Sequence, residues 1–222
     1  MIQERGSSVS LTAQRAVTRV LQVLMLLIFA VGVFYGNSGV AVNAAVGLLV
    51  TLLPAVIERR YAFTMHVGIV LWITVAMFLH ALGTLPLPGL DFLSAYTAVW
   101  WWDHMTHALS SSLVAGAAYA VTRTFQARTA HVNMPPKFMF AYLLVFVMAF
   151  GVLWELLEFY ISVAARAFGT AEVLTQYGLD DTVLDLCYNT LGGLLVAAFG
   201  TAHLTGLSAD LAERLEGRSP NR

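Results

Sequence analysis

Five acidic side chains and two histidines, residue types that bind metal ions or carry protons, occur in three short motifs of this chain. The motifs are Asp103-His104-Met105-Thr106-His107, Trp154-Glu155-Leu156-Leu157-Glu158 and Asp181-Thr182-Val183-Leu184-Asp185, and no lysine or arginine lies within them. A carboxylate buried in a bilayer costs on the order of 2.5–3.5 kcal/mol, so five unpaired ones cost more than ~10 kcal/mol. That cost is comparable to the whole stability of a domain. A divalent metal or bound protons must therefore neutralise the carboxylates.

The first motif places three potential metal ligands on one side of a predicted helix. Asp103 and His107 are four residues apart, and His104 and His107 are three apart. All three side chains therefore lie within an arc of ~100° and can face one centre. The competing explanation makes Asp103 a helix N-cap and the two histidines interfacial polar residues.

The second motif contains two glutamates that capping does not explain. Glu155 and Glu158 are three residues apart and share a helix face. They lie late in a predicted helix, where the helix dipole disfavours anions. The competing explanation is a pair of protonated glutamates that hydrogen-bond between helices. Because neither glutamate has a capping role, we predict that Glu155 or Glu158 acts as a general base.

The third motif begins a polar stripe along one helix face. Asp181, Asp185 and Asn189 follow one another in steps of four residues. The competing explanation is a capping box formed by Thr182 and Asp185, which leaves Asn189 unexplained. We expect Asn189 to support the site. His80, near the end of another predicted helix, is a second supporting candidate, with an interhelical contact as its alternative role.

Together the motifs predict a divalent metal site. Carboxylates with a few imidazoles, and no thiolates, suit Zn, Mn or Fe. Helical bundles often take such ligands from several helices. Bound metal polarises a phosphoryl or carbonyl oxygen and lowers the pKa of a coordinated water. The predicted ligands, for one metal ion or for two bridged by carboxylates, are Asp103, His104, His107, Asp181 and Asp185.

The composition indicates an all-α, polytopic membrane protein. Of the 222 residues, 59% are hydrophobic and only 11% are charged, whereas soluble domains carry about a quarter charged residues. The net charge of −1 gives no basis for a nucleic-acid partner, and the single Cys187 excludes an intrachain disulfide. We predict one integral membrane domain over residues 1–222. Its predicted transmembrane helices lie near 17–35, 39–57, 64–83, 103–124, 138–165 and 181–203.

The basic residues predict the orientation of these helices. Eleven of the twelve lysines and arginines fall on one side of the predicted helices, so both termini are expected in the cytoplasm. All three motifs then lie in the outer half, beside an aromatic belt that contains Trp100 and Trp101. The eleven basic residues are Arg5, Arg15, Arg19, Arg59, Arg60, Arg123, Arg128, Lys137, Arg214, Arg218 and Arg222, while Arg166 falls on the other side.

The order of the motifs resembles that of the YjdF-type family of bacterial inner-membrane proteins. The similarity runs over roughly residues 60–200: an aromatic residue before Asp-His-x-x-His, then Trp-Glu-x-x-Glu, then Asp-Asp-Thr-x-x-Asp-Leu-x-x-Asn-x-x-Gly-Gly. This resemblance implies a bacterial inner-membrane location and a shared polar site. A more distant similarity to VanZ-like membrane proteins, through Asp185, Asn189 and Gly192, implies association with the cell envelope. Thr106-His107 is faintly similar to a motif of membrane-bound metal-dependent hydrolases, whose fuller acidic-histidine pattern this chain lacks.

Three functions remain open at this point. The leading hypothesis is a membrane enzyme whose outward-facing metal site hydrolyses a lipid-linked or envelope substrate. The second is a proton- or cation-coupled transporter, because acids and histidines within membranes also mark ion pathways. The polar stripe ends near Asn189 and no inverted repeat is evident, which disfavours transport. The third is a non-catalytic membrane partner protein, although buried charges are a costly means of holding helices together.

Overall fold

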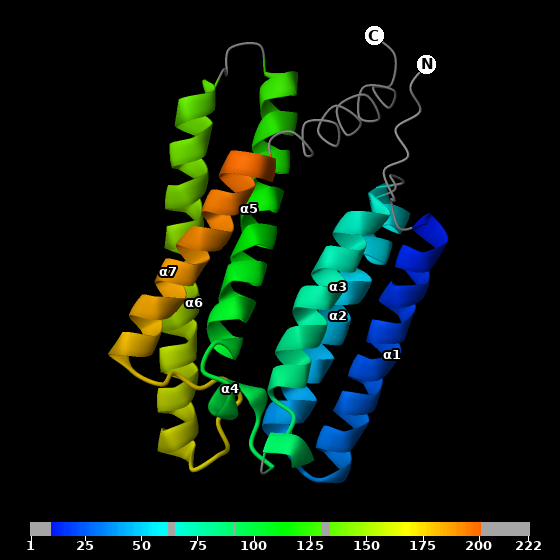
Figure 1. The fold of residues 1–222 in the computed structure, drawn as a ribbon, viewed down its shortest axis with the longest axis vertical. Coiled ribbons are helices and arrows are strands. Elements are labelled where there is room, and N and C mark those ends of the chain that lie inside the picture. Colours follow the sequence, from blue (N-terminus) through cyan, green and yellow to red (C-terminus); the bar gives the residue numbers. More distant parts are fainter. Residues whose placement is uncertain (1–9, 62–64, 91, 130–133, 201–222) are drawn as a thin grey trace. The chain divides into compact units, whose positions relative to one another are not determined.

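The regular secondary structure of the protein is helical throughout the residues that the computed structural model describes, which are 10–61, 65–90, 92–129 and 134–200. A helix lies at each of the six predicted stretches, and one short helix, α4, had not been predicted (Figure 1). The described helices are α1 (Leu11–Phe34), α2 (Ser38–Tyr61), α3 (Val67–Gly83), α4 (Ala95–Ala98), α5 (Trp102–Arg128), α6 (Pro136–Phe168) and α7 (Leu179–Leu195). A 3-10 turn (Pro88–Leu90) and a π-helical turn (Val196–Gly200) complete the regular structure. The all-α class is therefore confirmed.

The helix ends follow local residue chemistry. α1 begins six residues earlier than predicted, because Ser10 caps it by accepting a hydrogen bond from the amide of Ala13 at 3.2 Å. The turn after α1 contains Gly36 at φ +66°, a conformation that glycine adopts without steric cost. Pro136 occupies the first position of α6, and Gly169 ends α6 in the left-handed conformation.

Some of the sequence predictions concern residues outside the described ranges. These residues are 64 and 201–203, at the ends of two predicted helices, and the basic residues Arg5, Arg214, Arg218 and Arg222.

Three of the described helices are long and apolar enough to cross a membrane: Leu11–Phe34, Ser38–Arg60 and Pro136–Phe168. Val67–Gly83 is a shorter apolar helix. Large apolar side chains such as Phe34 and Val145 are exposed on these long helices, as expected for surfaces that face lipid. α5 carries the first polar motif and three consecutive serines, which lower its hydropathy. A total of about six membrane spans stays a prediction.

The chain forms two compact units, Met1–Leu82 and Gly83–Arg222. In the first unit, α1 packs against α2, and polar side chains join the helices. Gln22 on α1 donates to the hydroxyl of Thr51 on α2 at 3.2 Å. His80 Nε2 on α3 lies 2.9 Å from Asn43 Oδ1 on α2. Hydrogen bonds of this kind hold apolar helices together where lipid gives no hydrophobic driving force.

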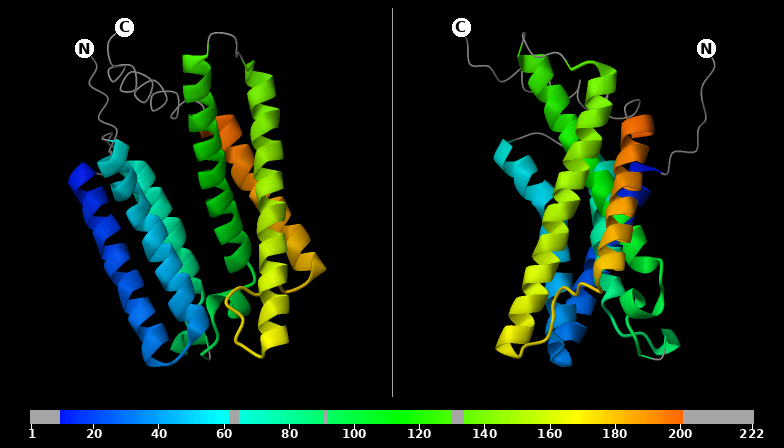
Figure 2. Two further views of the ribbon diagram at one scale, coloured as in Figure 1. Left: turned by 180° about the vertical axis from the view of Figure 1, so that it is seen from behind. Right: turned by 90° about the vertical axis from the view of Figure 1, so that its left-hand side faces the viewer.

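The second unit is built from α5, α6 and α7, and α7 packs against both of the other helices. α6 extends past the starts of α5 and α7, and the segment that follows runs back to the start of α7 (Figure 2). Glycines allow this close packing. A Cβ on Gly192 of α7 would collide with the carbonyl oxygen of Ala108 and the hydroxyl of Ser111 on α5. One on Gly151 of α6 would lie 2.7 Å from Asn189 Nδ2 on α7.

Candidate metal site

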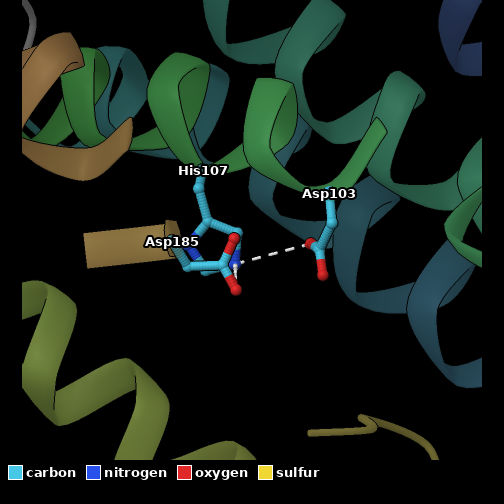
Figure 3. Close-up of side chains that lie close together, drawn as sticks. All are labelled: Asp103, His107 and Asp185. Carbon is cyan, nitrogen blue, oxygen red and sulfur yellow. Dashed lines mark ion pairs between the residues drawn. The ribbon is translucent and has the colours of Figure 1, made fainter. Parts of the chain in front are cut away.

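His107 on α5 lies among carboxylates from all three main helices of the second unit. Its Nε2 is 3.5 Å from Asp103 Oδ1 on the same helix and 3.8 Å from Asp185 Oδ2 on α7. Its Nδ1 is 3.9 Å from Glu155 Oε1 on α6. Figure 3 shows Asp103 and Asp185 converging on the imidazole ring. The three predicted motifs thus meet at one place.

His104 is held by two contacts with α7. Its Nδ1 lies 2.8 Å from Asp185 Oδ1, and its ring stacks on Tyr188 with centroids 5.0 Å apart and an interplanar angle of 11°. His104, Asp181 and Asp185 each offer a ligand atom within 4.8 Å of the others'. Asp185 therefore faces both histidines, with a different oxygen toward each.

Thr182 and Gln176 fix the carboxylate of Glu155. The Thr182 hydroxyl on α7 donates to Glu155 Oε2 at 2.9 Å, and Gln176 Nε2 donates to the Thr182 oxygen at 2.9 Å. Because that oxygen accepts from Gln176, its own proton is directed at Glu155. Glu158 is held within its own helix, where Trp154 Nε1 donates to its Oε1 at 2.9 Å. Glu155 is buried, whereas Glu158 is only partly buried.

Two buried carboxylate oxygens in this cluster accept no hydrogen bond from any described residue. They are Glu155 Oε1 and Asp185 Oδ2, the two oxygens that face His107. Asp185 is only 1% exposed and Glu155 only 5%. A buried carboxylate oxygen that lacks a donor costs free energy, so this arrangement is suited to a bound cation.

The ligand atoms lie close enough together to hold a first-row metal ion after small shifts. With metal–ligand distances of about 2.0–2.2 Å, neighbouring ligand atoms of a tetrahedral site are roughly 3.3–3.6 Å apart. The separations of 3.5 and 3.8 Å around His107 Nε2 are close to this range. A neutral imidazole has one lone pair for a metal, so binding through Nε2 leaves the Nδ1 proton directed at Glu155. A carboxylate on the second nitrogen is the usual way to orient such a ligand.

Capping does not account for Asp103 or Asp185, whereas Asp181 Oδ2 accepts a hydrogen bond from the Tyr177 amide at 3.3 Å, just before the start of α7. Trp101 is the N-cap of α5 and Gly178 is the N-cap of α7, and neither makes a side-chain capping hydrogen bond. The capping-box explanation for Thr182 is wrong, because its hydroxyl bonds to Glu155 instead. Asp180, the residue before Asp181, is exposed.

The two predicted supporting residues, Asn189 and His80, lie in different units of the chain. Asn189 is buried one turn beyond Asp185, where it packs against Gly151 of α6. His80 lies in the first unit and is hydrogen-bonded to Asn43, which is the alternative role given for it above. A supporting role for either residue stays a prediction.

Sequence reasoning missed Tyr188 and Gln176. Tyr188 lies three residues after Asp185, so helical spacing placed it on the polar stripe. Gln176 lies in an irregular segment, where no periodicity signals a contact. In the same segment, the pKa of Tyr177 is raised to about 12, first by partial burial and then by the negative charges of Asp103 and Asp181. The Tyr177 hydroxyl therefore stays protonated at neutral pH.

Removal of the Thr182 hydroxyl is expected to weaken metal binding. Thr182→Val keeps the shape of the side chain but leaves Glu155 Oε2 without its donor, so we expect a 10–100-fold loss of affinity for Zn²⁺ or Mn²⁺. Isothermal titration calorimetry of the purified protein with Zn²⁺ or Mn²⁺ measures this loss of affinity. The matched control is Thr190→Val, because Thr190 donates to Leu186 and Met148 two turns further along α7. Equal affinity in Thr182→Val and Thr190→Val would contradict the positioning role.

Comparison with known proteins identifies a family. The family described as "Predicted membrane protein (DUF2238)" matches residues 17–206. This match confirms the resemblance to the YjdF-type family, and the resemblance to VanZ-like proteins is not shown. No curated protein and no solved structure matches the chain.

Proposed function

Because the chain belongs to the DUF2238 family of predicted membrane proteins, we propose that it is an integral membrane metalloenzyme. Its site would bind a divalent metal at the outer side of a bacterial inner membrane and hydrolyse a lipid-linked or envelope substrate. One observation carries this proposal. Two buried carboxylate oxygens without a hydrogen-bond donor, Glu155 Oε1 and Asp185 Oδ2, face the same histidine ring from two different helices.

The residues divide into three roles under this proposal. Asp103, His107 and Asp185 hold the metal, which when bound polarises a phosphoryl or carbonyl oxygen and acidifies water. Glu155 Oε1 lies 3.9 Å from His107 Nδ1, beyond hydrogen-bond distance, and a small shift would let it accept the Nδ1 proton and orient the ring. Glu158 is the better candidate for the general base, because it is only partly buried and one of its oxygens remains outside the Trp154 hydrogen bond.

The outward orientation and the substrate class rest on charge and position. The positive-inside rule places the starts of α5 and α7, which carry the first and third motifs, on the outer side. The segment before α5 exposes Trp100 (77%) and Trp101 (43%), the residue type that anchors at the lipid headgroup level. A site beside this level meets the polar parts of lipid-linked substrates.

Metal analysis tests the proposal first. We expect plasma mass spectrometry to find near-stoichiometric or higher Zn, Mn or Fe in detergent-purified wild-type protein prepared without chelator. His107→Ala is expected to lower the metal content, because it removes the imidazole of the group formed with Asp103 and Asp185. The matched control is His66→Ala, since His66 lies outside the three motifs, before α3.

A wild-type protein without metal would overturn the metalloenzyme proposal. Protonated carboxylates would then be the remaining way to neutralise the cluster, and proton flux in proteoliposomes would test the transporter hypothesis. Metal retained in His107→Ala at the wild-type level would instead show that the bound metal lies elsewhere.

A further inference from the structure

The number of acidic side chains exceeds what one divalent ion neutralises. When all five carboxylates of the cluster are ionised they carry a formal charge of −5, and one divalent cation leaves −3. Among the ion pairs of the described residues, none joins a lysine or an arginine to these carboxylates, and Arg166 pairs with Glu172 at 3.2 Å. A second divalent cation reduces the charge to −1. The charge of −3 that one cation leaves is costly in a largely apolar bundle, so two divalent cations suit the cluster better than one.

The ligand atoms fall into two groups that share Asp185. One group is Asp103, His107 and Asp185, and the other is His104, Asp181 and Asp185. Each group supplies one imidazole and two carboxylates, all within 4.8 Å of one another. Asp185 directs Oδ1 toward His104 and Oδ2 toward His107, as a carboxylate that bridges two metal ions does.

The two remaining acids, Glu155 and Glu158, do not form a third metal position as good as the first two. His107, Glu155 and Glu158 also lie within 4.8 Å, but this group depends on the same imidazole as the first. Since a neutral imidazole gives one lone pair to a metal, His107 serves only one of the two groups. The Nε2 side has two carboxylates at 3.5 and 3.8 Å, so the first group is the better one.

We propose that the cluster is a dinuclear site in which Asp185 bridges two divalent metal ions, one bound with Asp103 and His107 and the other with His104 and Asp181. This proposal rests on the metal site proposed above. Carboxylate-bridged pairs of ions lie about 3.5–4 Å apart and stabilise both the attacking and the leaving oxygen of a displacement. His104, stacked on Tyr188, would bind after its Nδ1 contact with Asp185 opens or through its other ring nitrogen.

Metal stoichiometry and magnetic coupling test the second ion without an activity assay. We expect wild-type protein titrated with Mn²⁺ to bind about two ions per chain, with a magnetic-resonance spectrum broadened by coupling between them. Asp181→Asn is expected to bind about one ion and to show the resolved hyperfine pattern of an isolated Mn²⁺. Asp180→Asn, the same change at the exposed neighbouring residue, is the matched control and keeps the wild-type stoichiometry and coupling.

The outcomes separate this proposal from the one on which it rests. A wild-type protein that binds one Mn²⁺ with an uncoupled spectrum overturns the dinuclear site but leaves the metal site intact. Binding of no metal overturns both. Two bound ions without magnetic coupling would place the second ion elsewhere in the protein and also overturn the bridging role of Asp185. His104→Ala provides a second variant, expected to match Asp181→Asn.

Discussion

Asp185→Asn is expected to lower the affinity for a divalent metal by more than about 100-fold, because even partners that only orient metal ligands contribute 10–100-fold. Asparagine keeps the size of the side chain and an oxygen that accepts from His104. It removes the negative charge and one of the two oxygens that face the histidines. Asp185 is the buried residue common to the two ligand groups of the proposed dinuclear site, so no other single change is expected to weaken metal binding more.

The metal-free Asp185→Asn protein is expected to unfold at the same temperature as wild type or at a higher one. The substitution removes a carboxylate that is 1% exposed and has an oxygen without a donor among the described residues. Without metal, such a charge is a destabilising group. Thermal unfolding in detergent, with and without added Zn²⁺, measures both effects, since a ligand that binds only the folded state raises the unfolding temperature.

Asp180→Asn is the control for this experiment. Asp180 adjoins the site in sequence but is exposed, so the same change of charge should leave the metal-dependent rise in unfolding temperature intact. An equal rise in wild type and in Asp185→Asn would contradict the central role of Asp185.

Gly192→Ala is expected to lower both the stability of the second unit and its metal affinity. The added Cβ would collide with the Ala108 carbonyl oxygen and the Ser111 hydroxyl, and the backbone of a packed helix does not yield readily. Overpacking of this kind costs about 1–3 kcal/mol, equivalent to roughly 2–12 °C in unfolding temperature for a chain of this size. Because α5 and α7 carry most of the metal ligands, pushing these two helices apart should also weaken metal binding by about tenfold.

Gly89→Ala is the matched glycine control. A Cβ at Gly89 meets nothing within 4 Å, so unfolding temperature and metal affinity are expected to stay at wild-type values. Thermal unfolding and Mn²⁺ titration of the two variants side by side provide the measurement. An unchanged unfolding temperature in Gly192→Ala would show that α5 and α7 pack less closely than the structure indicates.

The sequence predicted the helices because their signals are local. Apolar runs of spanning length, Pro136 at the start of α6 and Gly36 in the turn before α2 each act through neighbouring residues. α4 was not predicted, because a helix of four residues, Ala95–Ala98, is too short to show periodicity. The start of α1 was placed late because the apolar run begins after the cap at Ser10.

Residue type and helical spacing are properties of single segments, so the sequence alone places five acids and two histidines on three helices with no basic residue beside them. Which of their atoms face each other depends on how the helices pack. Asp185 meets His104 across 81 residues, Thr182 serves Glu155 rather than a cap, and His80 pairs with Asn43. These contacts depend on how closely helices pack, and that distance is set by glycines such as Gly192, whose effect appears only when its helix meets another.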